Sequence, residues 1–147
     1  MFAIHTDNDL SQLRHLQNKK NIIVRFVMNG CGWCEQSQPM WDDATKRAVL
    51  SSDDAIAEIE SSFVNHFKQT MTNRDKINIR GYPTILIIRG KRISEHKGRD
   101  SESILSALRQ IKKLRSQPKS NFKSKTKTKK TKKTKKTKSR SNFKSFT

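Results

Sequence analysis

The spacing of apolar residues changes along the chain between two periods, which predicts alternating strands and helices. Short apolar runs predict strands at Phe2–Thr6, Ile22–Met28, Ala55–Glu60 and Thr84–Ile88. Only Arg25 interrupts the run Ile22–Met28, as expected of a strand that is covered on both faces in a parallel sheet. After Gly90, the segment Arg92–Lys97 alternates Ile93 with polar neighbours, which predicts an antiparallel edge strand.

Between these runs, apolar residues recur every three or four positions, which predicts four helices. Their apolar faces are Leu10, Leu13 and Leu16; Trp41, Ala44, Ala48 and Val49; Phe63, Val64, Phe67 and Met71; and Ile104, Leu105, Leu108 and Ile111. The candidate N-caps are Thr6 or Asp7, Ser62 and Asp100. The second helix is expected to continue from Cys34 and to be kinked by Pro39. The order β-α-β-α-β-α-β-β-α predicts an α/β fold with a mixed sheet and helices on both faces.

The composition of the chain changes near its end. Residues 115–147 hold 14 of the 32 basic residues and none of the 13 acidic ones. This segment has no apolar periodicity and repeats Lys-Lys-Thr from Lys129 to Thr137. It can bury too little apolar surface to offset the entropy of ordering. We therefore expect a folded domain over 1–114 and a disordered, basic, Lys/Thr/Ser-rich tail over 115–147.

Such a positively charged tail is expected to bind polyanions without reading their sequence. Nucleic acids, acidic proteins and anionic membrane surfaces all fit this expectation. Phe122, Phe143 and Phe146 could stack on bases. The alternative is a tail that only improves solubility or directs localisation. Low-complexity Lys-Thr tails of this kind also resemble those on small enzymes of large DNA viruses.

The two cysteines lie three positions apart, in Cys31-Gly32-Trp33-Cys34, at the predicted strand-to-helix turn. At a helix N-terminus, free N–H groups and the helix dipole stabilise a thiolate. The thiolate is the attacking species in disulfide exchange, so Cys31 is the predicted nucleophile. Cys34, one turn into the helix, is close enough to attack the resulting mixed disulfide and release the substrate.

Zinc binding is the main alternative for this cysteine pair. Structural zinc usually takes four ligands, and the chain has no second cysteine pair. Its four histidines lack a zinc-ligand spacing; they are His5, His15, His66 and His96. The sequence contains no apolar run of the ~18 residues that span a membrane, and its start does not read as a signal peptide. We therefore expect an intracellular, reducing location, where a lone cysteine pair is more often catalytic or metal-binding than structural.

Over about Phe2–Leu114, the chain resembles the thioredoxin family. The matching features are the strand Ile22–Met28 running directly into the cysteine motif, Pro39 five positions after Cys34, the segment Arg80-Gly81-Tyr82-Pro83-Thr84 before an apolar strand, and the turns at Gly90 and Gly98. The resemblance implies a thioredoxin fold in which Pro83 is cis and faces the cysteines. It also implies that the backbone of Tyr82 pairs with the substrate chain. An ordinary trans turn proline is the alternative for Pro83.

Between and beside the cysteines, the sequence departs from the family pattern. Gly30 replaces the usual tryptophan before the first cysteine, and Trp33 replaces the usual proline or histidine before the second. Trp33 is expected either to offer an apolar docking surface or to fold back over the neighbouring loop. In this family the residues between the cysteines, here Gly32 and Trp33, help to set the redox poise. The direction of the reaction is therefore left open.

Arg25 is the most informative departure from the family. Thioredoxins carry a buried acid six residues before the first cysteine, opposite a lysine, and this acid moves protons for the second cysteine. Here Arg25 stands at the acid's position and Glu58 at the lysine's position. A buried arginine needs a partner, so we expect the pair to be present with its charges exchanged and Glu58 to be the candidate proton carrier. The alternative is a register shifted by one residue, with Arg25 reaching solvent.

These observations favour a thiol–disulfide oxidoreductase that reduces protein disulfides without a bound cofactor or metal. Its expected partners are protein disulfide substrates, an electron-donating reductase, and nucleic acid or another polyanion at 115–147. Two alternatives remain open. One is a polyanion-binding module in which the thioredoxin-like domain is a scaffold, and the other is a protein-disulfide oxidase or isomerase.

Overall fold

Five strands form a mixed sheet in the computed structural model, which describes residues 1–113 and the side chains of residues 1–110. The strands are β1 (Phe2–Ile4), β2 (Asn21–Val27), β3 (Asp54–Glu60), β4 (Thr84–Arg89) and β5 (Arg92–His96). Their order across the sheet is β1-β3-β2-β4-β5. Strands β1, β3 and β2 run parallel, whereas β4 and β5 are antiparallel to their neighbours. This arrangement confirms the predicted mixed sheet and the edge position of β5.

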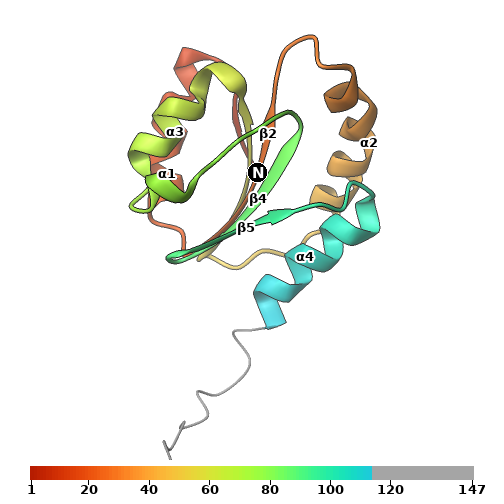
Figure 1. The fold of residues 1–147 in the computed structure, drawn as a ribbon. Coiled ribbons are helices and arrows are strands. Elements are labelled where there is room, and N and C mark those ends of the chain that lie inside the picture. Colours follow the sequence, from red (N-terminus) through yellow and green to blue (C-terminus); the bar gives the residue numbers. More distant parts are fainter. Residues whose placement is uncertain (114–147) are drawn as a thin grey trace, which may run out of the picture.

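Helices cover both faces of this sheet. Figure 1 shows α1 (Leu10–Gln17) and α3 (Val64–Thr70) on one face, and α2 (Gly32–Lys46) and α4 (Ser101–Lys113) on the other. Three short 3₁₀ turns complete the described elements: η1 (Asp7–Asp9), η2 (Ser61–Phe63) and η3 (Arg74–Lys76). Phe26 and Phe67 meet edge to face in the core under α1 and α3, with ring centroids 5.5 Å apart. Trp41 is fully buried in the second core, under α2 and α4.

The central strand β2 positions the site because both of its faces are buried. Successive side chains on a strand point to opposite faces. Val24 and Phe26 belong to the core under α1 and α3, whereas Ile23 belongs to the core under α2 and α4. Arg25 has the same parity as Ile23, so the apolar pattern of this strand directs a guanidinium group beneath α2, close to the cysteines.

Two predicted helix boundaries are wrong. Helix α2 ends at Lys46 rather than continuing through Val49, which is exposed. The chain instead turns at Ser51, whose backbone and hydroxyl both donate to Asp54, and such local hydrogen bonds compete with a helix. Ser62 is not an N-cap, because it lies inside η2. The N-cap of η2 is Glu60, whose carboxylate accepts the backbone N–H of Ser62 at 2.9 Å.

The other N-caps follow the predictions more closely. Thr6 precedes η1 and forms a capping box with Asp9. The carboxylate of Asp100 accepts the backbone N–H of Ser103 at the start of α4. The side chain of Ile111 and the predicted tail at 115–147 lie outside the described residues.

Candidate active site

The turn from β2 into α2 places Cys31 at the start of a helix. Gly30 precedes it with φ +73°, a left-handed conformation that glycine adopts without a steric penalty. Cys31 is the N-cap of α2, and its Sγ accepts the backbone N–H of Cys34 at 3.2 Å. The two cysteines are joined by a disulfide, with Cα atoms 5.2 Å apart. Cys31 is the more exposed of the two, at 9% against 5% for Cys34.

A second loop lies against this disulfide. The peptide bond between Tyr82 and Pro83 is cis, which confirms the conformation predicted for Pro83. The carbonyl oxygen of Tyr82 lies 3.7 Å from the Sγ of Cys31, and the Tyr82 side chain packs against the cluster of Val27 and the two cysteines. The backbone just before the cis-proline is therefore beside the sulfur that would react first.

Arg25 and Glu58 form the predicted buried ion pair. The two residues are directly opposite each other on β2 and β3, and Arg25 Nη1 lies 2.8 Å from Glu58 Oε2. The side chains are 1% and 7% exposed, which rules out the alternative in which Arg25 reaches solvent. The exchanged charge pair is confirmed as a structural feature of this chain.

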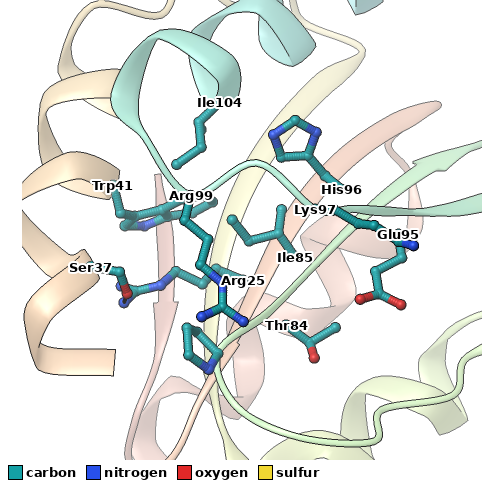
Figure 2. A pocket seen from close by; sticks show the side chains of 11 residues that line it. Arg25, Ser37, Trp41, Thr84, Ile85, Glu95, His96, Lys97, Arg99 and Ile104 are labelled. Carbon is teal, nitrogen blue, oxygen red and sulfur yellow. Dashed lines mark hydrogen bonds between the residues drawn. The ribbon is translucent and has the colours of Figure 1, made fainter. Parts of the chain in front are cut away.

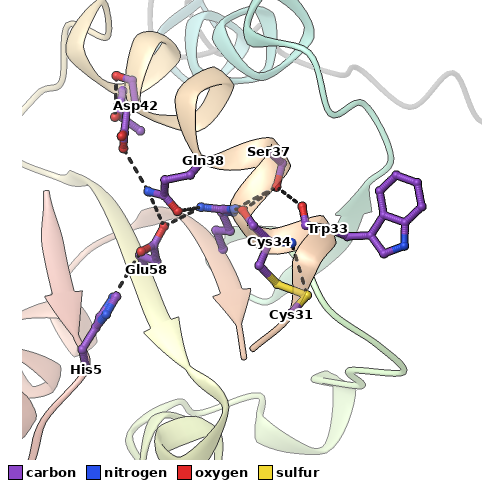
Figure 3. A network of polar contacts seen from close by, with 10 residues as sticks. His5, Cys31, Trp33, Cys34, Ser37, Gln38, Asp42 and Glu58 are labelled. Atoms are coloured by element: carbon purple, nitrogen blue, oxygen red, sulfur yellow. Dashed lines mark hydrogen bonds and ion pairs between the residues drawn. A yellow bond between two sulfur atoms is a disulfide. The ribbon is translucent and has the colours of Figure 1, made fainter. Parts of the chain in front are cut away.

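The guanidinium of Arg25 also binds residues of α2; Figure 3 labels its partners Cys34, Ser37 and Gln38. Nη2 donates to the carbonyl of Cys34 at 2.6 Å and to Ser37 Oγ at 2.8 Å. Nη1 donates to Gln38 Oε1 at 2.5 Å in addition to Glu58. Because a guanidinium stays charged in proteins, Arg25 can stabilise negative charge near Cys34 but cannot accept a proton. Of the two partners in the ion pair, only Glu58 can do so.

His5 joins this network, and its contribution was not predicted from the sequence. Its Nε2 lies 3.2 Å from Glu58 Oε1 (Figure 3), whereas Arg25 binds the other carboxylate oxygen, Oε2. Cys34, Glu58, His5 and Gln38 all line one open pocket of roughly 350 Å³. The His5 side chain is 44% exposed, so the pocket connects the region beneath Cys34 with solvent. One signal for this contact was available. His5 directly follows β1, and β1 pairs with β3 so that Ala3 lies opposite Glu58.

Between the cysteines, Gly32 begins α2 and Trp33 projects outward. Trp33 is 66% exposed, and its indole points away from the disulfide (Figure 3). The alternative in which this side chain folds back over the loop is therefore wrong. Within residues 1–110, no three His, Cys, Asp or Glu side chains are grouped to hold a metal ion. Of the helices that the structure describes, none is long and apolar enough to cross a membrane.

Comparison with known proteins agrees with this geometry. The family model described as Thioredoxin matches residues 3–110. The chain belongs to the thioredoxin family. The match covers most of α4 and the whole sheet except Phe2, so both the cysteine turn and the cis-proline loop lie within the thioredoxin domain.

Among curated proteins, this thioredoxin-family chain is 26% identical over 103 residues to a protein disulfide-isomerase from Hordeum vulgare. The aligned region covers 67% of the chain but only 18% of that protein. Solved structures include the first thioredoxin domain of mouse protein disulfide-isomerase A4, with 21% identity and a TM-score of 0.53 over 86% of this chain and 84% of that one. The germline-specific thioredoxin Deadhead from Drosophila melanogaster has 22% identity and a TM-score of 0.51, over 76% and 99%. These structural similarities support the fold alone.

Proposed function

We propose that this chain is a thiol–disulfide oxidoreductase that reduces disulfides in proteins, with Cys31 and Cys34 as its dithiol. The observation that carries the proposal is the Cys31–Cys34 disulfide at the start of α2, with Cys31 Sγ 3.7 Å from the carbonyl before cis-Pro83. A structural disulfide would not need a helix N-terminus and an adjoining backbone carbonyl beside its sulfur. An exchanging disulfide uses both.

In the first step, the thiolate of reduced Cys31 attacks one sulfur of a substrate disulfide. A mixed disulfide forms, and the other substrate sulfur leaves as a thiolate that takes up a proton. The backbone N–H of Cys34, which binds Cys31 Sγ in the disulfide state, can also stabilise the attacking thiolate. Tyr82 and Pro83 supply a backbone edge along which the substrate chain lies, and the exposed Trp33 supplies an apolar contact.

In the second step, Cys34 loses its proton and attacks the Sγ of Cys31. The Cys31–Cys34 disulfide forms, the second substrate thiolate leaves, and two electrons have passed to the substrate. Glu58 is the proposed acceptor of the Cys34 proton, through water in the pocket that both residues line. His5, bound to the same carboxylate and partly exposed, provides the route from Glu58 to solvent. An electron-donating reductase then returns the pair to the dithiol.

The direction of exchange is the finer part of this proposal. The curated relative from Hordeum vulgare is named a protein disulfide-isomerase, which favours isomerase or oxidase activity as the second candidate. The reduction potential of the pair separates the two, because the potential of thioredoxin is about −270 mV and that of protein disulfide isomerase is about −180 mV. A potential near the more negative value supports the reductase.

Reduction of insulin by the full-length chain, with dithiothreitol as electron donor, tests the activity itself. We expect turnover above that of dithiothreitol alone. Turnover equal to the dithiothreitol background would leave the second class of function, a polyanion-binding module with a thioredoxin-like scaffold.

We further propose that residues 115–147 bind polyanions independently of the dithiol chemistry. Support comes from the 14 basic and no acidic residues in this segment. Deleting Pro118–Thr147 is expected to leave insulin reduction nearly unchanged and to remove most duplex DNA binding. Binding by the full-length chain should weaken with salt, with a slope near about −0.9 per phosphate neutralised. Binding that survives the deletion, or that ignores salt, contradicts this assignment.

A further inference from the structure

A second pocket lies on the other side of the cis-proline loop, between the sheet and α2 (Figure 2). Its volume is about 250 Å³. Three segments supply the lining residues that matter here: Ser37 and Trp41 from α2, Pro83 and Thr84 at the start of β4, and Lys97 and Arg99 from the loop between β5 and α4. In Figure 2, the side chain of Arg99 extends across the pocket toward Arg25 and Thr84. Arg25 and Pro83 also line this pocket, but the proposed catalytic steps leave its interior unoccupied.

The pocket adjoins the disulfide through two of its walls. Pro83 directly follows Tyr82, whose carbonyl lies 3.7 Å from Cys31 Sγ. Ser37 accepts a hydrogen bond from Arg25, and its own hydroxyl oxygen lies 3.1 Å from the carbonyl of Cys34. An extended chain advances about 3.4 Å per residue. A substrate held by its cysteine at Cys31 can therefore place a side chain one to three residues away into this pocket.

The indole nitrogen of Trp41 lies buried behind the wall of the pocket. Trp41 is fully buried, and its Nε1 has no hydrogen-bond partner among the residues described. A buried donor without a partner costs about 1–3 kcal/mol, so such groups are normally paired. The nitrogen itself has almost no accessible surface, so Trp41 contributes a closed wall to the pocket and no donor for a ligand.

The charge around the pocket is positive. Within the described part of the chain, neither Lys97 nor Arg99 forms an ion pair. Two nearby acids are already engaged: Glu102 binds Arg47 at 2.6 Å, and the Asp100 carboxylate accepts the backbone N–H of Ser103. Of the residues that line the pocket, Glu95 alone carries a carboxylate.

The loop that carries Arg99 is held in place at both ends. His96 Nε2 lies 3.2 Å from Ser103 Oγ, which ties the end of β5 to the start of α4. Gly98 lies inside this bridge, where a Cβ atom would approach Ser103 Cβ to 2.7 Å and His96 Nε2 to 2.9 Å. No side chain fits at position 98 without moving these partners. The two cationic residues that flank Gly98 are therefore presented on a fixed backbone.

We propose that this pocket binds a carboxylate of the substrate, so that the enzyme prefers disulfides with an aspartate or glutamate near the reacting cysteine. Arg99 offers paired donors that match the two oxygens of a carboxylate, and Lys97 adds positive charge. This inference rests on the proposed dithiol activity and adds the class of substrate to it.

Three disulfide-linked peptides that differ only by Glu, Gln or Lys two residues from the cysteine test the inference. The rate constant for single-turnover reduction by the pre-reduced, full-length chain is measured for each peptide at low salt. We expect the Glu peptide to react about fivefold faster than the Lys peptide, as is typical of one exposed charge pair. Free glutamate at high concentration tests whether a small carboxylate competes with the peptide for the pocket. If it slows reduction of the Glu peptide alone, the pocket also accepts small carboxylates.

Arg99→Glu is expected to invert the preference between the Glu and Lys peptides and to leave the Gln peptide unaffected. Arg92→Glu makes the same charge change at the opposite end of β5 and is the matched control. An unchanged Glu-to-Lys ratio in Arg99→Glu, or an equal change in Arg92→Glu, overturns the inference while the dithiol activity stands. Failure to reduce any of the peptides overturns the proposed function instead.

Discussion

Two neighbouring strands of the sheet, β2 and β3, each lead into a helical segment, and the two turns use different N-caps. The strands end side by side, with Val27 opposite Glu60. At the first turn, Cys31 Sγ accepts the backbone N–H of Cys34 at 3.2 Å. At the second, Glu60 Oε2 accepts the backbone N–H of Ser62 at 2.9 Å. In both turns, therefore, a side chain accepts a free backbone N–H of the first helical turn, and the two turns lie at the same end of neighbouring strands.

The difference between the caps is their chemistry. The Glu60 carboxylate is buried, which raises its pKa, but hydrogen bonds from the side chains and backbone of Ser61 and Ser62 outweigh burial and lower the pKa to about 2. The Cys31 sulfur is a weaker acceptor, and it is also a nucleophile. One turn uses the free N–H groups for stability. At the other, a weaker cap keeps a reactive atom at the helix start.

Replacing each cysteine by serine tests the reactive turn and has the largest expected effect. Cys34→Ser should trap substrates as mixed disulfides on Cys31, because the first attack remains possible and release does not. Cys31→Ser should trap none and should abolish insulin reduction. The adducts are detected as bands that disappear on reduction in gel electrophoresis. Equal trapping by both variants, or trapping by Cys31→Ser alone, reverses the assignment of the nucleophile.

The second-largest effect is expected from the buried Arg25–Glu58 ion pair beneath α2. Among the described contacts, the turn at Glu60 has no such buried ion pair. Arg25→Asp or Glu58→Lys places two like charges in a buried site and should lower the free energy of unfolding by about 3–5 kcal/mol. The double variant restores one charge of each sign and should recover much of that loss. Denaturant unfolding of the three variants measures the coupling. Simple addition of the two single effects would show that the residues do not act as partners.

Much of this site was accessible from the sequence because it depends on short-range patterns. The cysteine turn follows from an apolar run ending beside a Cys-x-x-Cys motif. An arginine in a central strand predicted that a buried partner exists, and the resemblance to the thioredoxin family identified Glu58 as that partner. The cis conformation of Pro83 came from the resemblance to the thioredoxin family, since the local sequence alone does not fix an isomer.

What the sequence did not predict depends on contacts between distant segments. His5 meets Glu58 across 53 positions, and no periodicity marks that contact. The pocket at Arg99 depends on the turn at Gly98, where His96 meets Ser103. The misplaced cap at Ser62 has a local cause. Glu60 belongs to a strand by pattern, yet its side chain reaches forward to the next turn.

Substitutions in the proposed proton route should have a smaller effect, and only on the rate of disulfide exchange at the cysteine turn. Glu58→Gln keeps a hydrogen-bonding group but removes the proposed proton acceptor, so release of the mixed disulfide should slow by about 10- to 100-fold. The first attack by Cys31 should change less. His5→Gln, at a partly exposed position, should slow release on the order of threefold. Single-turnover kinetics separate the two steps. Equal slowing of both steps would indicate a general disturbance of the site and no proton transfer through Glu58.

Removal of the stabilising cap has the smallest expected effect, and it should leave the chemistry intact. Glu60→Gln should lower the free energy of unfolding at pH 7 by about 1 kcal/mol, as is typical of a lost N-cap. Because folding lowers the pKa of Glu60 from 4.5 to about 2, its charge-dependent stabilisation is present above pH 4.5 and is lost as the pH falls toward 2. The difference between wild type and variant, measured by urea unfolding, should therefore shrink across this interval. Asp75→Asn removes a carboxylate whose side chain is 97% exposed and is the control variant. A difference that stays constant from pH 7 to pH 3 would mean that Glu60 stabilises the turn by packing, and not through the charge that distinguishes its cap from that of Cys31.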